Sequence, residues 1–299
     1  MAWTVGTLTF VLVRILPGDI AYKIAAGRYG DDGVTSAAAQ AVRDELGLDK
    51  PAWQMYLNWL GDLMTLDLGN SLVTGSPILY ELKNQLSYTL VLAAGGIVLA
   101  ALIAIPVGLW CGVKHNQGID HGGLAVSTFI RSQPVFCLGL ILIFILGMEL
   151  RLFPVAGYSS PAHAVLPVLT LGLSLAAVSN RVVRNSTRQA MMSGYFQFAR
   201  IKGLSRWRVL RAHVLPNALL PVLAFMGIQL IGLIEGIIMI ESLFAWPGIG
   251  HGLSHAVFAR DIPMLQGTAL LMGLMFVLVN TLVDLSQYYL DPRTREGEG

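Results

Sequence analysis

Between Arg181 and Pro216 the chain reads RVVRNSTRQAMMSGYFQFARIKGLSRWRVLRAHVLP. This stretch contains eight Lys or Arg residues and no Asp or Glu, and long uncharged runs lie on both sides of it. A strongly basic loop between two apolar segments marks the cytoplasmic side of a bacterial-type membrane protein, because the Lys and Arg bias of short loops sets the orientation of the spans. The stretch therefore predicts a membrane-spanning fold and a cytoplasmic position for this loop.

The loop also predicts a short helix. Ser193 is a suitable N-cap residue, and residues 195–201 then form an amphipathic segment with Arg200 and Lys202 on its polar side. Gly203 is a natural helix stop, because glycine adopts the left-handed conformation at little cost. We expect this helix to end at Gly203.

A second short helix is expected over residues 206–213, ending at Pro216. Two short helices with exposed aromatic side chains on the cytoplasmic face suit a surface on which another protein docks. The alternative is an interfacial loop whose arginines only contact lipid headgroups. The pattern of residues alone leaves both interpretations open.

The composition indicates an all-α polytopic membrane protein. Of 299 residues, 55% are hydrophobic and only 13% are charged, which is far too apolar for a soluble domain. Cys111 and Cys137 both lie in apolar runs, so we interpret them as packing residues rather than a disulfide. The sequence shows no Cys/His cluster with the spacing of zinc ligands.

The longest polar region, residues 18–85, has the opposite charge from the basic loop. It holds nine acidic and five basic side chains, a net charge of −4, which places it outside the membrane on the periplasmic side. Helices are expected over residues 37–46 and 51–66, with Gly47 stopping the first.

About six transmembrane helices are predicted in all. The first apolar run, residues 2–13, is shorter than the roughly 20 residues that a span requires, so we expect this span to be truncated or its start misplaced. A cleaved signal peptide is the alternative, and the absence of positive charge before the apolar run disfavours it. The remaining five spans are expected over residues 90–113, 122–148, 164–180, 218–240 and 262–283. In the fifth of these six spans, Gly232 and Gly236 would form a face of small residues for close helix packing.

The segment FARIKGLSRWRVLRAHVLPNALLPV resembles the EAA loop of ABC-transporter permeases, in the branch that imports dipeptides, oligopeptides and nickel. The chain departs from that pattern at Gly194, where an acidic residue usually precedes the tyrosine, and at the family's glutamate, where it has Gln197 or Phe198. Three further segments resemble the same family: LGLDKPAWQMYLNWL with LDLGNSL, ESLFAWPGIGHGLSHAVFARDIP, and LDPRTR near the end of the chain. The positions that match the loop motif are Tyr195, Ala199, Lys202, Gly203, Leu204, Ser205, Leu215, Asn217 and Ala218.

The resemblance implies the type I ABC importer permease fold in a bacterial inner membrane. It divides the chain into a first transmembrane helix at 1–17, a periplasmic segment at 18–86, a five-helix core at 87–290 and a cytoplasmic tail at 291–299. Residues 185–216 of the core would be the coupling loop, in which Arg200 and Lys202 flank the groove of an ATPase.

The implied partners are a second homologous permease chain, two ATP-binding cassette subunits and a periplasmic solute-binding protein, besides the lipid bilayer; no nucleic acid is expected. Di- or oligopeptides are the expected cargo. Glutathione, nickel or a metal chelate remain alternatives, because members of this family share these motifs.

The sequence lacks the motifs of an ATPase or a hydrolase. None of the five lysines follows a glycine, so no Walker A loop is present, and neither GxSxG nor HExxH occurs. We therefore expect ATP and Mg to bind to partner subunits, with no cofactor on this chain. Two other classes stay open: a passive channel, and a membrane enzyme that uses Glu235, Glu241 or Asp284.

Two charged residues, Arg131 and Glu235, fall inside predicted spans, where a charge costs about 2.5–3.5 kcal/mol on insertion scales. They could pair with each other, face the translocation path, or snorkel to the membrane edge. His251 and His255 stand at i and i+4, a spacing that suits a metal, but no third ligand is nearby in sequence, so no metal site is predicted.

Overall fold

The computed structural model describes residues 2–15, 18–30, 34–46, 50–64 and 67–290. Within these ranges the chain is helical, and its only β interaction is an isolated bridge between Asn70 and Pro77. The predicted all-α class is therefore confirmed. The chain forms two compact units, residues 1–89 with 247–277 and residues 90–246 with 278–299. Gly47, Asp49 and the predicted tail at 291–299 lie outside the described residues.

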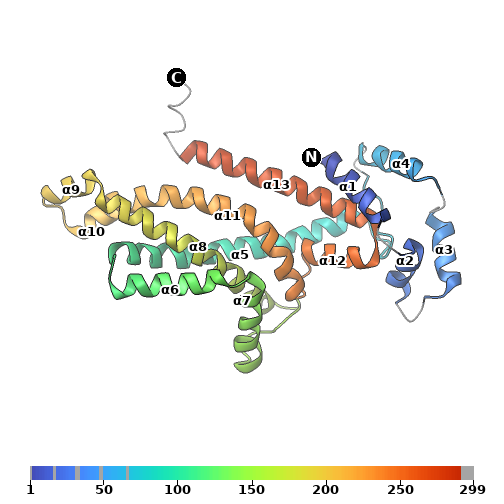
Figure 1. Ribbon diagram of the computed structural model, residues 1–299, viewed down its shortest axis with the longest axis horizontal. Helices are drawn as coiled ribbons and strands as arrows, with labels where there is room; N and C mark the ends of the chain where they lie inside the picture. Colours follow the sequence, from blue (N-terminus) through green and yellow to red (C-terminus); the bar gives the residue numbers. More distant parts are fainter. Residues whose placement is uncertain (1, 16–17, 31–33, 47–49, 65–66, 291–299) are drawn as a thin grey trace, which may run out of the picture. The chain divides into compact units, whose positions relative to one another are not determined.

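The first unit is built from short helices (Figure 1). These are α1 (Ala2–Ile15), α2 (Ile20–Tyr29), α3 (Ser36–Leu46), α4 (Ala52–Met64) and α12 (Ile249–Ala259). The helices predicted over 37–46 and 51–66 correspond to α3 and α4 and are confirmed.

Helices α2 and α3 pack through a small apolar core made of Ala21, Ile24, Ala25 and Val42. The carboxylate of Asp19 caps α2 by accepting the backbone N–H of Ala21 at 2.9 Å.

The second unit is organised around α8 (Val165–Met192), which packs against α6 (Gly118–Ser132), α7 (Val135–Leu142) and α11 (Leu215–Leu243). A π-helical turn (Ile143–Glu149) follows α7, and a 3₁₀ turn (Pro161–Ala164) precedes α8. Two long helices, α5 (Ile78–Val113) and α13 (Ile262–Leu290), contribute residues to both units.

Four helices in the described residues are long and apolar enough to cross a membrane: Ile78–Val113, Pro161–Met192, Trp207–Leu230 and Ile262–Leu285. A fifth is obtained if α6 and the helix that follows it count as one broken span. The α1 helix has fourteen residues, about 21 Å at 1.5 Å per residue, which is less than the roughly 30 Å of a bilayer core. The count of six spans stays a prediction.

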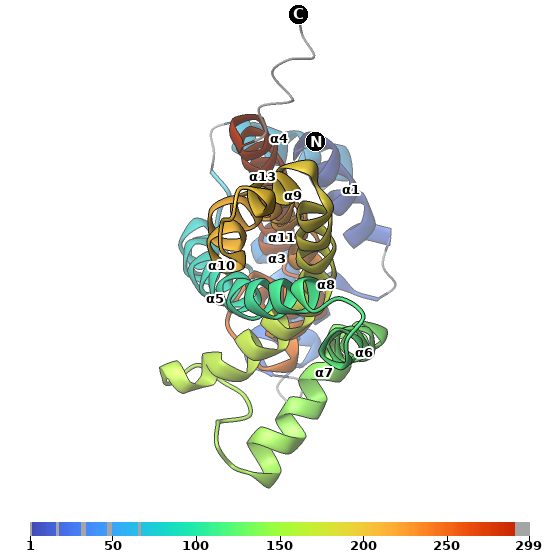
Figure 2. The ribbon, with the colours of Figure 1, turned by 90° about the vertical axis from the view of Figure 1, so that its left-hand side faces the viewer.

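The span predicted over residues 122–148 is not one straight helix. Helix α6 ends at Ser132 and α7 begins at Val135, and the two helices meet at a bend of 103° (Figures 1 and 2). The cause is Pro134, whose ring forces the preceding residue out of the helical region. Gln133 accordingly has an extended backbone, with φ −95° and ψ 139°.

A seam of small residues brings α5 and α8 close together. Every fourth position of α5 is small along this face: Gly96, Ala100, Ala104, Gly108 and Gly112. A Cβ atom added at Gly108 would lie 2.5 Å from Cβ of Val183 and 2.9 Å from the backbone oxygen of Asn180. Such seams let helix backbones approach closely in membranes, where packing rather than the hydrophobic effect drives helix association.

The seam that the sequence analysis placed at Gly232 and Gly236 behaves differently. A Cβ at either position would meet nothing within 4 Å in the described part of the chain. Close packing is therefore seen at Gly108 but not at Gly232 or Gly236 among the described residues, and a packing role for these two glycines stays a prediction.

The replacement of Gly108 by alanine is expected to lower the stability of the fold by about 1–3 kcal/mol, because the added methyl group overpacks a contact made with backbone. Gly232→Ala is the matched control, since alanine there gains about 0.5–1 kcal/mol of helix propensity with no clash. Thermal unfolding of both variants in detergent, followed by size-exclusion chromatography, measures the difference. Equal melting temperatures would contradict the role of the seam.

Candidate functional site

The basic loop between α8 and α11 contains one well-formed helix, α9 (Gly194–Ile201). Figure 1 shows it at the ends of α8 and α11, and Figure 2 looks onto this end of the unit. Ser193 occupies the N-cap position with an extended backbone, as predicted. Its side chain does not cap α9, because its hydroxyl donates to the carbonyl of Ala190 in the preceding helix.

The end of α9 is set by Gly203. Its φ is +80°, in the left-handed region that favours glycine, and the prediction of a stop at this residue is confirmed. The N–H of Gly203 donates to the carbonyl of Arg200, and the N–H of Leu204 donates to that of Ala199. These two bonds form a Schellman motif, which satisfies the last carbonyls of the helix and turns the chain back sharply.

Helix α9 presents apolar side chains to its surroundings. Of its residues only Ala199 is buried, at 6% exposure, whereas Phe198 is 59% exposed and Ile201 is 82% exposed. Tyr195 and Trp207 are exposed as well. Exposed apolar patches of this kind mark surfaces for protein or membrane contact.

The predicted basic residues lie beside this apolar face. Arg200 is exposed and donates to the carbonyl of Leu204 at 3.3 Å. The Nζ atom of Lys202 lies 4.5 Å from the centre of the Phe198 ring, a cation–π contact that the sequence did not predict. Together these residues form the α9 face: Tyr195, Phe198, Arg200, Ile201 and Lys202.

The prediction of a separate second helix that ends at Pro216 is wrong. Helix α10 (Arg206–Val209) runs through a π-helical stretch (Leu210–Val214) directly into α11. The wider turn accommodates Pro216, which has no N–H to donate and whose ring crowds the preceding turn of a regular helix. Ser205 starts this segment, and its Oγ accepts the backbone N–H of Arg208 at 3.4 Å.

The two candidate path residues are not brought together by any contact that the described residues show. Arg131 lies in the last turn of α6, one residue before the end of that helix, and its side chain is exposed. Glu235 belongs to α11, but its side chain lies outside the described residues. Their pairing, and their roles along the path, stay predictions.

A buried ion pair holds the turn of residues 114–117 against α8. Asp120, in the first turn of α6, has a side chain that is 1% exposed and accepts two hydrogen bonds from the guanidinium of Arg184, the second at 2.7 Å. The same carboxylate accepts the backbone N–H of Asn116 at 2.9 Å. The pair spans 64 positions in the sequence, and the sequence analysis did not anticipate it.

Arg184 lies on α8, the helix that leads into the loop, nearly three helical turns before α9 begins at Gly194. Two parallel N–H···O bonds from a guanidinium fix the geometry of a carboxylate better than a single contact does. The pair therefore fixes the position of α8 relative to α6 close to the basic loop.

Trp246, at the end of the same unit's segment 90–246, is buried, with a side chain that is 5% exposed. Its backbone N–H donates to the carbonyl of Glu241 at 2.8 Å.

Residues 104–296 match the family model described as "Binding-protein-dependent transport system inner membrane component". Among curated proteins, the chain is 34% identical to the dipeptide transport system permease protein DppB of Escherichia coli K12, over 96% of this chain and 93% of the relative. It is 36% identical to the glutathione transport system permease protein GsiC of Pectobacterium atrosepticum, over 97% and 94%.

Solved structures support the same fold. A chain of the MetNI methionine ABC transporter, in an inward-facing conformation, superimposes with a TM-score of 0.59 at 21% identity, over 72% of this chain and 98% of that one. A chain of an amino acid ABC transporter solved with histidines gives a TM-score of 0.56 at 18% identity, over 71% and 94%. The fold of this chain is thus that of an ABC importer permease.

Proposed function

Because this chain belongs to the family of inner membrane components of binding-protein-dependent transport systems, we propose that it forms half of the translocation path for di- or oligopeptides. A periplasmic binding protein delivers the peptide, and ATP hydrolysis on separate subunits drives its passage. The similarity to dipeptide and glutathione permeases along nearly the whole chain supports a peptide cargo.

One observation carries the proposed mechanism: the α9 face exposes apolar and basic side chains at a Schellman turn in the most basic loop of the chain. In the proposed mechanism, an ATP-binding cassette subunit covers this face and moves with it. Helix α8 leads directly into α9, so displacement of α9 is passed to α8 and to the helices packed against it. This is alternating access by rocking of packed helices.

The complete importer in this proposal contains a second homologous permease chain, two ATPase subunits that bind ATP and Mg, and the solute-binding protein. This chain itself binds no cofactor and performs no hydrolysis. It is a multi-pass protein of the bacterial inner membrane, and the Arg131 and Glu235 positions are candidates to line the path.

The proposed function is tested by reconstitution. The chain is co-expressed with the partner permease and ATPase subunits, purified as a complex and placed in liposomes with the binding protein and a labelled dipeptide. ATP-dependent accumulation of the peptide is expected. Conductance by the chain alone would favour a passive channel, and catalytic turnover without an associated ATPase would favour a membrane enzyme.

A topology prediction accompanies the proposal. Single cysteines at Gln117, Ser193 or the C-terminus are expected to react only with reagents that cross the membrane. Cysteines at Asp49, Ser159 or His255 are expected to react with an impermeant reagent added from outside. Labelling of a Ser193→Cys variant from outside would contradict the orientation that the charge pattern predicts.

A further inference from the structure

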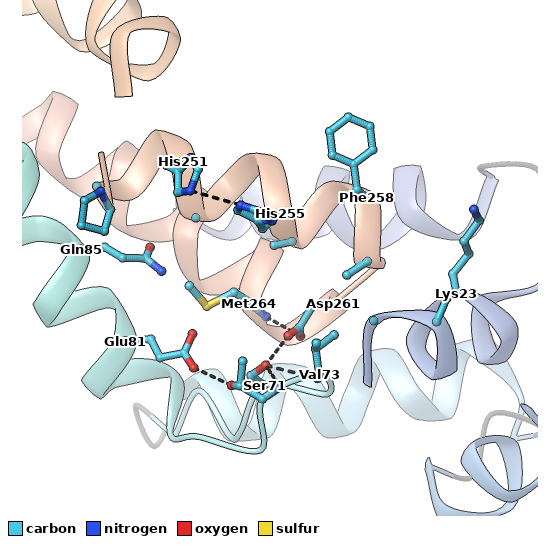
Figure 3. A pocket seen from close by; sticks show the side chains of 18 of the residues that line it. Lys23, Ser71, Val73, Glu81, Gln85, His251, His255, Phe258, Asp261 and Met264 are labelled. Carbon is cyan, nitrogen blue, oxygen red and sulfur yellow. Dashed lines mark hydrogen bonds between the residues drawn. The ribbon is translucent and has the colours of Figure 1, made fainter. Parts of the chain in front are cut away.

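The first unit contains a cavity of about 700 Å³ that plays no part in the loop described above (Figure 3). It is lined by α5, α12, α2 and the turn at residues 69–77. The volume lies within the range of small-molecule binding sites, about 300–1,000 Å³. The polar and charged groups along its walls determine what kind of molecule fits.

The wall formed by α5 offers hydrogen-bond acceptors. Glu81 and Gln85 stand one turn apart on the same face of the helix, and both side chains line the cavity (Figure 3). The Oε1 atom of Glu81 accepts the hydroxyl of Thr74 at 2.5 Å, and the second carboxylate oxygen remains for another donor. The Oε1 atom of Gln85 is buried, and no donor within the described ranges reaches it. An acceptor buried in this way is costly unless a bound molecule donates to it.

The opposite wall, α12, adds two imidazoles. The Nε2 atoms of His251 and His255 lie 3.1 Å apart. Burial lowers the pKa of His251, and the neighbouring His255 lowers that pKa further. At neutral pH His251 is therefore uncharged and does not repel a cation.

The floor of the cavity is negative and rigid. Asp261 is 3% exposed, and its carboxylate accepts the hydroxyl of Ser71 and the backbone N–H groups of Leu72 and Met264. The charged residues of the lining are this carboxylate, Glu81 and Lys23, a net charge of −1. Lys23 points away from the other labelled side chains (Figure 3). The part of the cavity between α5 and α12 thus favours a cationic donor.

We propose that this cavity binds the protonated amino terminus of a peptide, whose ammonium group donates to Glu81 and to Oε1 of Gln85. The inference rests on the proposed function, because the peptide that would bind to the first unit belongs to the substrate class proposed above. A primary ammonium has three N–H donors and no acceptor, which matches a wall of acceptors. An N-acetylated peptide lacks both the charge and two of these donors.

The test uses the full-length chain in liposomes, with Cys137→Ser to remove the partly exposed native thiol. A Val73→Cys variant places a thiol on the cavity wall, and its reaction with a small maleimide is timed with and without alanyl-alanine. A peptide concentration of about twice its Kd slows labelling roughly threefold, since the fraction of unoccupied cavities is 1/(1 + [L]/Kd). N-acetyl-alanyl-alanine is expected to give no protection. Ser36→Cys, an exposed position away from the cavity lining, is the control and is expected to label at one rate throughout.

Two further variants distinguish loss of peptide recognition from a change in how readily the maleimide reaches the introduced thiol. Glu81→Gln keeps an acceptor for Thr74 but removes the charge, so protection by alanyl-alanine is expected to be lost while the unprotected labelling rate stays the same. Gly252→Ala acts on Gln85, because a Cβ at Gly252 would lie 2.4 Å from Oε1 of that side chain and displace its amide. It is expected to weaken protection without unfolding the unit, since a flexible side chain absorbs the clash.

Three results would overturn the inference: equal protection by both peptides, protection by neither, or protection by Zn²⁺ alone, which would assign the cavity to a metal held by His251 and His255. Each of these leaves the proposed function standing if the reconstituted transporter still accumulates the dipeptide. Loss of ATP-dependent accumulation in the wild-type complex would instead contradict the proposed function itself.

Discussion

Replacement of Asp120 by alanine is expected to destabilise the chain by about 3–5 kcal/mol, the cost of removing one partner of a buried ion pair. The change leaves the guanidinium of Arg184, whose side chain is only 12% exposed, without its two carboxylate bonds. It also leaves the backbone N–H of Asn116 without its acceptor. Less folded protein and a lower melting temperature in detergent are the expected observations.

A double-mutant cycle tests whether loss of the Asp120–Arg184 ion pair causes the destabilisation. Arg184→Ala is expected to destabilise the chain comparably, because it leaves a carboxylate that is 1% exposed. The double variant is expected to recover part of the loss, since neither charge then remains buried alone. Arg188→Ala, one turn further along α8 and exposed, is the control and should have a small effect. Additive losses in the double variant would show that the two side chains act independently.

Much of the fold was predictable because its signals are local. Caps, charge patterns and apolar runs gave α3 and α4, the stop at Gly203, and one end each of α5, α8 and α13. The other ends were missed: α5 begins at Ile78 rather than residue 90, and α8 ends at Met192 rather than residue 180. The bend at Pro134 was missed because the apolar run continues on both sides of it. Proline lacks a backbone N–H donor, and this loss does not change the hydropathy of the run. The seam at Gly108 was readable as a small residue at every fourth position, but Gly232 and Gly236 were chosen instead.

The contacts between distant residues were not predictable from one sequence. Nothing in the sequence around Asp120 or Arg184 indicates that these residues meet, since 64 positions separate them. The cavity beside Gln85 likewise combines residues of α2, α5 and α12, which only the folded chain brings together. The amphipathic segment of α9 could be predicted because its residues lie close together in the sequence, within residues 195–202.

Replacement of Gly203 by aspartate is expected to uncouple ATP hydrolysis from transport. A side chain at φ +80° costs about 1–2 kcal/mol in strain, and the strain falls on the turn that sets the direction of α9. A Cβ at Gly203 would meet no atom of the described residues within 4 Å, so insertion and folding should persist. A change of about 1.4 kcal/mol in the free-energy difference between the productive and unproductive positions of α9 changes the ratio of their populations roughly tenfold.

Gly194→Asp is the matched control for this change. It adds the same charged side chain to the same loop, at a position where the backbone is not left-handed. A Cβ there would likewise meet nothing within 4 Å in the part of the chain that the structure describes. An aspartate there stands at the first turn of α9, where a negative charge is favourable. We expect this variant to assemble and transport like the parent chain.

The most direct test of the account is the number of dipeptide molecules accumulated per ATP hydrolysed, measured in liposomes that contain the complete transporter and its binding protein. The account predicts a ratio lowered by roughly tenfold or more for Gly203→Asp, with ATPase activity retained, and an unchanged ratio for Gly194→Asp. An unchanged ratio for Gly203→Asp would contradict the assignment of the α9 loop as the element that couples ATP hydrolysis to transport.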